Sequence, residues 1–178
     1  MEKGIILVVD DSEINRGLIV NMFQDRFDCI EAENGEVAVG CLEEYKERIV
    51  MVLLDIVMPV LDGYGVLRYM SEHGYISWCP VILITGDASS ECDVIAYDYG
   101  VSDIVRKPFE SRVVLRRVNN IIDLYEHKRH IEQTLYEREE ELRLKNQELE
   151  ESNEFLIDAL SSVVEFRDIE SGEHIKRI

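Results

Sequence analysis

The chain has 178 residues, a hydrophobic content of 46% and a formal net charge of −18. This length suits one domain of ordinary size with an appendage, or two small domains. The negative charge argues against general nucleic-acid binding and against binding to an anionic membrane surface. No apolar run approaches the roughly 20 residues that span a bilayer, so no membrane segment is predicted.

The cysteines and the N-terminus both indicate a cytoplasmic protein. The four cysteines are widely spaced and include no C-x-x-C pair. They are typical of small buried hydrophobic residues in a reducing cytosol, and a zinc site or a disulfide is the alternative. The N-terminus carries Lys3 and a short strand-like run without a small-residue cleavage site. It is therefore not predicted to be a signal peptide.

The first 108 residues alternate between strand and helix patterns. Short apolar runs predict strands at residues 5–9, 29–32, 49–54, 80–84 and 104–105. Ser12 can cap the first of the intervening helices, and Gly100 ends the helix predicted near residues 89–99. Strands that alternate with helices five times predict an α/β fold with a parallel sheet covered on both faces. Right-handed crossovers then limit the topology to a few doubly wound orders.

Beyond residue 108 the sequence predicts a long helix, since neither glycine nor proline occurs again before Gly172. Leucines recur every seven residues at 135, 142, 149 and 156, and Val163 continues the series. If these are the d positions of a heptad repeat, the a positions are Glu132, Glu139, Asn146, Asn153 and Leu160. Leucines paired with asparagine at a positions are typical of a parallel two-stranded coiled coil and thus of a homodimer. A single amphipathic linker helix would show the same leucines.

Four of the predicted strands end in chemically reactive residues, namely Asp10-Asp11, Asp55, Thr85 and Lys107. In a parallel sheet these strand ends lie on one edge, where ligands bind. Clustered carboxylates need a hard cation, and oxygen ligands suit Mg²⁺. Lysine and threonine could then bind the oxygens of a phosphoryl group that one carboxylate attacks. Asp55 stands alone and is predicted to be that nucleophile, while the paired acids hold the metal. Any one of these residues could instead simply cap a loop.

These motifs resemble a response-regulator receiver domain over residues 4 to about 123. The resemblance rests on Asp10-Asp11, on Asp55 with Met58-Pro59 and Asp62-Gly63, on Thr85-Gly86, and on Lys107-Pro108-Phe109. It implies a flavodoxin-like fold with strand order 2-1-3-4-5 and Mg²⁺-dependent phosphoryl transfer from a histidine kinase to Asp55. It also implies that Asp10, Asp11, Asp55 and the backbone carbonyl of Val57 bind Mg²⁺, and that Thr85 and Lys107 bind the phosphoryl oxygens.

Two residues distinguish this sequence within the receiver pattern. Family members usually carry Tyr or Phe three residues before the lysine, where this chain has Ile104. Output is therefore expected to depend more on the helix after the fourth strand than on an aromatic switch. Val57 follows the phospho-acceptor by two residues, and its side chain cannot orient an attacking water. Slow self-dephosphorylation is predicted.

Residues 165–174 resemble the opening of the HD-GYP phosphohydrolases, which hydrolyse cyclic di-GMP at two or three metal ions of the Fe or Mn type. The resemblance implies that Glu170 and His174 are metal ligands in an intact parent protein, and a carboxylate and an imidazole four residues apart can share one metal. The expected organisation is a receiver at 1–123, a helical linker at 124–160 and a truncated output domain at 161–178. The chain as given is therefore expected not to be an enzyme, while its parent is expected to be a cyclic di-GMP phosphodiesterase.

Other functions compete with this interpretation. The chain could be the receiver of a hybrid kinase or a stand-alone dimerising signalling protein without a phosphodiesterase. A kinase dimerisation helix with His174 as phospho-acceptor is disfavoured, because such histidines usually precede an acidic residue and a proline, and Ile175 and Lys176 follow here. A nucleotide-binding enzyme is disfavoured because both G-x-G-x-x-G and a P-loop are missing. The expected partners are a histidine kinase and a second copy, with no nucleic acid and no membrane.

Overall fold

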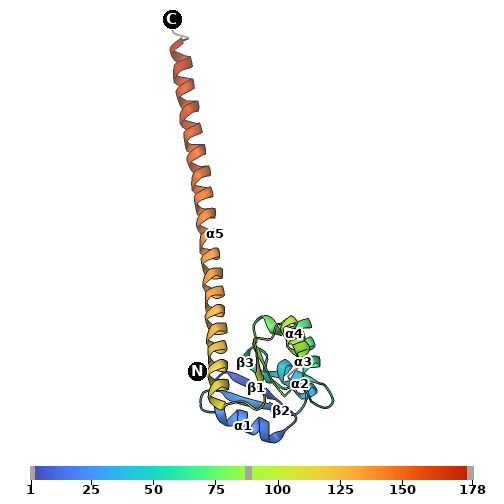
Figure 1. Ribbon diagram of the computed structural model, residues 1–178. Coiled ribbons are helices and arrows are strands. Elements are labelled where there is room, and N and C mark those ends of the chain that lie inside the picture. The colour runs from blue at the N-terminus through green and yellow to red at the C-terminus, as the bar shows by residue number, and fades with distance from the viewer. Residues whose placement is uncertain (1–2, 87–89, 176–178) are drawn as a thin grey trace. The chain divides into compact units, whose positions relative to one another are not determined.

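A five-stranded parallel sheet in the order β2-β1-β3-β4-β5 forms the centre of the fold (Figure 1). The structure is a computed structural model that describes the backbone of residues 3–86 and 90–175 and the side chains of residues 3–86 and 93–162. The strands are β1 (Ile5–Val9), β2 (Asp28–Ala32), β3 (Ile49–Leu54), β4 (Val81–Thr85) and β5 (Asp103–Arg106). This order confirms the predicted doubly wound, flavodoxin-like architecture.

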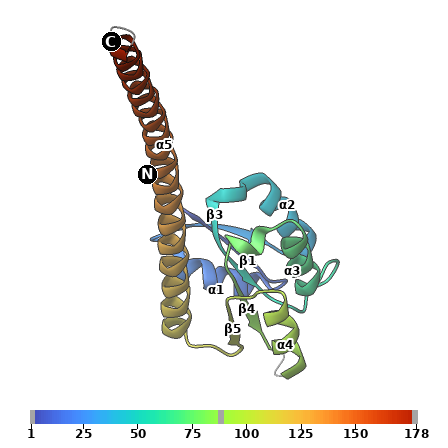
Figure 2. The ribbon, with the colours of Figure 1, turned by 90° about the horizontal axis from the view of Figure 1, so that it is seen from above.

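Helices cover both faces of the sheet, as Figure 2 shows when the molecule is seen from above. One face carries α1 (Glu13–Phe23) and the beginning of α5 (Ser111–Ile175). The other face carries α2 (Gly35–Tyr45), α3 (Gly63–Glu72) and α4 (Ser90–Asp98). Two short 3₁₀ helices that the sequence did not predict, η1 (Lys46–Arg48) and η2 (Tyr75–Ser77), precede β3 and β4.

Alternation along the strands divides the core into two clusters. In β1, Leu7 packs toward α2 and α3, while Ile6 and Val8 pack toward α1 and α5. Side chains that alternate between two covered faces explain why these strands are continuous apolar runs. The pairing of β1 with β3 shifts by one residue between Ile5 and Ile6. After this shift the strands stay in register to Val9 and Leu54, so Asp10 and Asp55 emerge side by side.

The helix α5 continues without interruption from Ser111 to Ile175. The chain falls into two units, residues 1–129 and residues 130–178, which are described separately. The predicted domain boundaries after residues 123 and 160 both lie within α5 and stay predictions. Among the residues that the structure describes, no helix has the length and apolarity needed to cross a membrane.

Candidate functional site

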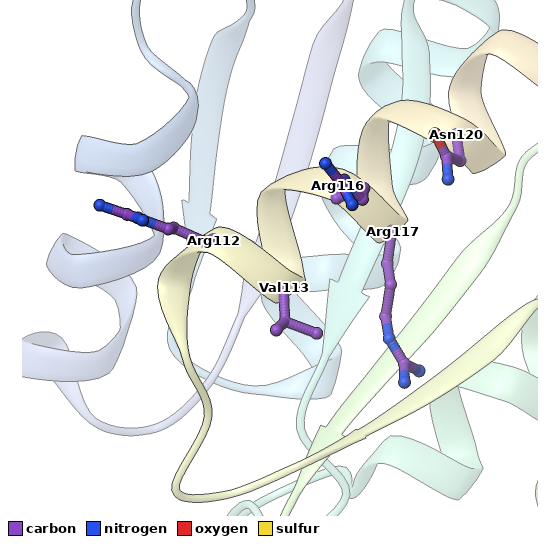
Figure 3. Close-up of a pocket in the computed structure, with 5 residues that line it drawn as sticks. All are labelled: Arg112, Val113, Arg116, Arg117 and Asn120. Atoms are coloured by element: carbon purple, nitrogen blue, oxygen red, sulfur yellow. The ribbon is translucent and has the colours of Figure 1, made fainter.

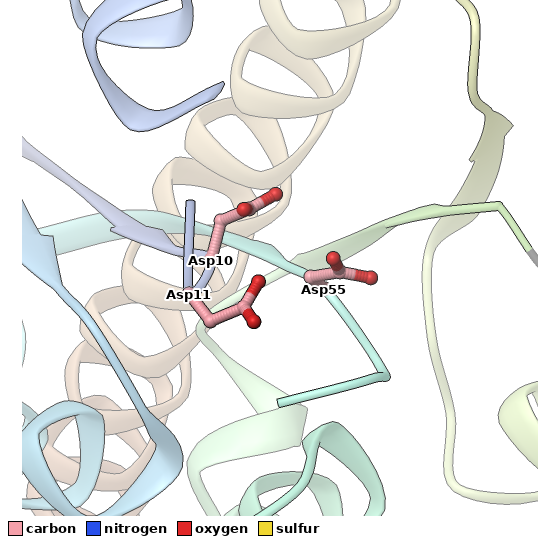
Figure 4. A group of neighbouring side chains, drawn as sticks. All are labelled: Asp10, Asp11 and Asp55. Carbon is pink, nitrogen blue, oxygen red and sulfur yellow. The ribbon is translucent and has the colours of Figure 1, made fainter. Parts of the chain in front are cut away.

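Three carboxylates meet at the carboxyl edge of the sheet (Figure 4). Asp10 and Asp11 follow β1, Asp55 follows the adjacent strand β3, and one oxygen of each lies within 4.8 Å of the others. Asp10 and Asp55 are 1% and 7% exposed, whereas Asp11 is exposed to solvent. Buried carboxylates this close together repel each other strongly, so the arrangement requires positive charge.

Lys107 supplies positive charge to the two buried carboxylates. Its Nζ atom lies 2.6 Å from Asp10 Oδ2 and 2.6 Å from Asp55 Oδ2. Burial by itself lowers the pKa of Lys107, but hydrogen bonds to Asp10 and Asp55 outweigh that effect and raise the pKa above its ordinary value. The side chain therefore stays an ammonium ion throughout the physiological pH range.

Asp10 is held by the first turn of α1. The backbone N–H of Ser12 donates to Asp10 Oδ1 at 2.9 Å, and the Asn15 side-chain amide donates to both carboxylate oxygens at 3.1 and 3.2 Å. Arg16 donates from Nη1 to the backbone carbonyl of Asp10 at 2.9 Å and from Nε to Glu31 at 3.0 Å. These contacts fix both the backbone and the side chain of Asp10. Sequence analysis missed Asn15 and Arg16.

The backbone around Asp55 is equally constrained. The N–H of Asp55 donates to the carbonyl of Val9 at 2.8 Å, and the N–H of Ile56 donates to Asp55 Oδ1 at 2.7 Å. Gly63 then returns the loop to the strand end, because its N–H donates to the carbonyl of Ile56 at 2.9 Å. A Cβ atom on Gly63 would lie 2.4 Å from the carbonyl oxygen of Asp55. Only glycine allows this approach without a backbone shift.

The remaining predicted site residues divide into those that the structure positions and those that it does not describe. Thr85 ends β4, is fully buried, and accepts a backbone hydrogen bond from Lys107 N–H at 2.9 Å. The side chain of Val57 is 70% exposed. The role of its backbone carbonyl as a metal ligand stays a prediction. The metal-binding and phosphoryl-binding roles assigned to the other site residues also stay predictions. The side chains of Glu170 and His174 lie outside the described residues.

Two ion pairs tie the edge strand β5 to its neighbours. Arg106 pairs with Asp93 on α4, and Arg117 on α5 pairs with Asp103 at 2.9 Å. Ile104, at the position where the family usually has an aromatic ring, is half-buried against the core cluster under α2 and α3. Among the described side chains, an ion pair thus connects β5 with α4 and another connects β5 with α5.

A shallow hollow of about 390 Å³ lies on α5, away from the acidic residues (Figure 3). It is lined by Arg112, Val113, Arg116, Arg117 and Asn120. Arg112 and Arg117 point in different directions, the latter toward β5 (Figure 3), and none of the three carboxylates contributes to it. The hollow is therefore separate from the candidate site.

The three carboxylates fit a divalent cation that prefers oxygen ligands. Asp10, Asp11 and Asp55 present only oxygen atoms, and among the described side chains neither histidine nor cysteine joins this cluster. Such a donor set matches Mg²⁺ rather than zinc or copper. Asp11 is exposed and the two buried acids already share the ammonium of Lys107, so a cation would add its charge to a partly neutralised pocket.

Known proteins are similar to this chain in sequence. A Vibrio cholerae protein named "Probable cyclic di-GMP phosphodiesterase" is 32% identical over an alignment of 181 residues, which covers 99% of this chain and 40% of the relative. The Staphylococcus aureus transcriptional regulatory protein SrrA is 30% identical over 122 residues, covering 68% of this chain and 48% of the relative. The chain thus spans less than half the length of these relatives.

A solved structure and a protein-family model are also similar to this chain. The structure resembles one chain in the crystal structure of the CheX–CheY–BeF3–Mg complex from Borrelia burgdorferi, with 28% identity and a TM-score of 0.62 over 66% of this chain and 88% of the other. Residues 6–119 match the family model described as the response regulator receiver domain. Receiver domains take phosphoryl groups from histidine kinases and bind Mg²⁺ at an acidic pocket. This chain belongs to the response regulator receiver domain family.

Proposed function

We propose that this protein is the input module of a response regulator and accepts a phosphoryl group on Asp55 from a histidine kinase. The observation that carries the proposal is the convergence of Asp55 with Asp10, Asp11 and Lys107 at one sheet edge. Bound Mg²⁺ would supply charge neutralisation for the transferred phosphoryl group. Asp10 and Asp11 would hold it together with Asp55.

The hydrogen bonds of Asp55 indicate which oxygen attacks. Oδ1 accepts from the Ile56 backbone N–H, which cannot move away, whereas Oδ2 accepts from the flexible Lys107 side chain. Oδ2 is therefore the oxygen that forms the new bond to phosphorus, as the bond between phosphorus and the donor histidine nitrogen breaks. Lys107 then turns from Oδ2 to a phosphoryl oxygen, and the Thr85 hydroxyl donates to another.

The acceptor is tested by incubation with acetyl phosphate and Mg²⁺, with the phosphoprotein resolved by a phosphate-affinity gel. Asp55→Asn is expected to abolish labelling. Asp62→Asn is the matched control, because Asp62 only caps α3 by accepting from Gly65 N–H at 2.8 Å, and asparagine caps equally well. Labelling of Asp55→Asn at the level of Asp62→Asn would remove Asp55 from its role.

Exposed apolar residues that follow Asp10 and Asp55 closely in sequence, here called the apolar rim, support a protein as the phosphoryl donor. Ile14 and Leu18, one turn apart on α1, are 77% and 51% exposed, and Val57 and Val60 are 70% and 74% exposed. Apolar groups gathered around a polar centre are typical of docking surfaces. Ile14→Ser is expected to slow phosphoryl transfer from the cognate kinase while leaving labelling by acetyl phosphate unchanged. Equal loss with both donors would contradict docking at this rim.

The signal is proposed to leave the pocket through β5. When Lys107 and Thr85 close on the phosphoryl group, β5 shifts with them, because its last residue, Arg106, immediately precedes Lys107. The shift biases the face formed by α4, β5 and α5 between two arrangements. The Arg106–Asp93 pair carries the displacement to α4.

The output is proposed to be a cyclic di-GMP phosphodiesterase in a longer parent protein. The name of the Vibrio cholerae relative and its alignment with 99% of this chain support this proposal. A metal site that includes Glu170 and His174, with two or three ions of the Fe or Mn type, would belong to that parent. The gene beyond codon 178 should encode the His-Asp and Gly-Tyr-Pro motifs, and the purified parent should hydrolyse cyclic di-GMP. The 178-residue chain is expected to show no turnover, and metal-dependent turnover by it would contradict the proposal.

The protein is also proposed to form a homodimer through the second part of α5. Leu135, Leu142, Leu149 and Leu156 are between 53% and 60% exposed. Large apolar side chains that repeat every seven residues favour burial against another helix. Sedimentation equilibrium of the chain should give a dimer, and replacing Leu142 and Leu149 with serine should give a monomer. A wild type that stays monomeric at all concentrations would refute this proposal.

A further inference from the structure

The exposed leucines of α5 are accompanied by a second line of residues that differs along its length. The leucine line consists of Leu135, Leu142, Leu149 and Leu156, which repeat every seven residues and lie along one side of the helix. The second line lies three residues before each of these leucines and before Val163, and it consists of Glu132, Glu139, Asn146, Asn153 and Leu160. All five of its members are exposed. It changes from charged, through amide, to apolar along the helix.

We propose that α5 pairs with the α5 of a second copy in parallel and in register. The two helices pack tightly over residues 146–160 and associate only weakly at Glu132 and Glu139. This inference rests on the proposed homodimer and specifies its polarity and its weak segment. Other features of the described side chains, residues 130–162, support it. They are the pairing preference of the asparagines and the neutralised flanks of the seam.

The two asparagines determine polarity. In a parallel, in-register pair, each residue of the second line faces its own copy, so Asn146 faces Asn146 and Asn153 faces Asn153. A side-chain amide carries both donors and acceptors, so each pair can form hydrogen bonds within the seam. Antiparallel pairing would instead place each asparagine against a leucine and bury an amide without a partner, which is unfavourable. A parallel shift of one heptad would place Asn153 against Leu160.

The charged residues that flank the seam do not oppose this pairing. Arg138 pairs with Glu141 at 2.8 Å, Arg143 with Glu140 at 3.2 Å, and Lys145 with Glu141 at 2.7 Å, all within one helix. Between residues 138 and 145, three basic side chains thus contact two carboxylates of their own chain. These pairs reduce the charge that a second helix meets along this part of the seam.

The glutamates of the second line have the opposite effect. In the parallel pair each faces an identical carboxylate across the seam, and like charges at this distance repel. Pairing is therefore tight from Asn146 to Leu160 and weak near Glu139. The weak segment follows residue 129 in the chain, so it can open while the helices stay associated further on.

The weak segment is tested with two neighbouring substitutions that remove the same charge. Glu139→Gln is expected to lower the dimer dissociation constant roughly tenfold, because it relieves a repulsion across the seam. Glu137→Gln is the control, since Glu137 lies outside both lines and accepts from Gln133 at 3.1 Å, a bond that glutamine can keep. Sedimentation equilibrium of the 178-residue chain measures both. Equal dissociation constants for the two variants would refute the claim that Glu139 weakens pairing in this segment.

Polarity is tested by oxidative cross-linking of Asn146→Cys and of Asn153→Cys, with the wild type as the control for the native cysteines. A parallel, in-register pair should cross-link at both positions, because each residue faces its own copy. An antiparallel pair places each residue of the second line against a leucine, so neither position should cross-link. A dimer that cross-links at one position or at neither would overturn the inference and leave the proposed dimer intact. A monomeric wild type would instead refute the proposed dimer, and this inference with it.

Discussion

Gly63 determines whether the loop after β3 can close against Asp55, and its replacement gives a quantitative prediction. A Cβ atom at this position would lie 2.4 Å from the Asp55 carbonyl oxygen and 2.7 Å from Ile56 Cα. The first distance is about 1 Å below an ordinary van der Waals contact. Both neighbours are backbone atoms fixed by hydrogen bonds to β1 and to Gly63 itself, so neither can move aside alone.

Gly63→Ala is therefore expected to destabilise the protein by about 2–3 kcal/mol, as overpacking of a rigid site does. This is a large part of the roughly 5–15 kcal/mol that stabilises an ordinary domain. The backbone shift would also displace the Asp55 carboxylate from Lys107. The yield of aspartyl phosphate should thus fall even in the folded fraction.

Gly17→Ala provides the matched control. Gly17 lies within α1, and apart from its chain neighbours and the nearby helix backbone no atom lies within 4 Å of the position that a Cβ atom would take, so alanine should stabilise the helix by about 0.5–1 kcal/mol. Urea unfolding followed by circular dichroism measures both variants, and acetyl phosphate labelling measures the site. If Gly63→Ala matched the wild type in stability and labelling, the close approach of Gly63 to Asp55 would be refuted.

Other residues give further predictions. Without Mg²⁺, Lys107→Met should lower the free energy of unfolding, measured in urea, by about 2 kcal/mol. The loss is smaller than for a fully buried pair because the ammonium is partly exposed. Mg²⁺ should restore the lost stability, and a variant as stable as the wild type without Mg²⁺ would contradict the bridging role of Lys107. Val60→Asn should stabilise by about 1 kcal/mol, because Val60 has φ +69° and asparagine tolerates this conformation better; a loss of stability would count against strain. Val57→Asn should shorten the aspartyl-phosphate lifetime by orienting water, and an equal or longer lifetime would refute this. Burial raises the pKa of Cys79 to about 12. Iodoacetamide at a pH near 8 should therefore modify Cys29 before Cys79, which peptide mass spectrometry can measure. Equal rates of modification would contradict the burial of Cys79.

The sheet and its reactive edge could be predicted because their determinants are local in sequence. Each apolar run ends at a polar residue, and a parallel sheet brings those ends together whatever the loops do. The Lys107 ammonium accordingly lies within hydrogen-bond reach of both Asp10 and Asp55. The long helix was equally visible, because a stretch without glycine or proline contains nothing that would end it.

The supporting residues of the site could not be predicted, because their roles depend on tertiary contacts. Asn15 and Arg16 look like the polar side of an amphipathic helix, yet the Arg16 side chain is only 12% exposed and donates to the Asp10 carbonyl. Val60 adopts a positive φ although a β-branched residue disfavours it, because the loop must return to Gly63. In the sequence, Asn15 and Arg16 were distinguished only by lying close to Asp10-Asp11, and Val60 only by lying close to Asp62-Gly63.

The ion pairs around β5 should make the protein's response to phosphorylation depend on the ionic strength of the solution. An aromatic ring that moves between buried and exposed positions is driven by hydrophobic burial, which moderate salt changes little. Arg106–Asp93 and Arg117–Asp103 are partly exposed charge pairs, which weaken as mobile ions screen them. Ionic strength should therefore change how firmly β5 holds α4 and α5, and with it how far a phosphorylated pocket influences the helices.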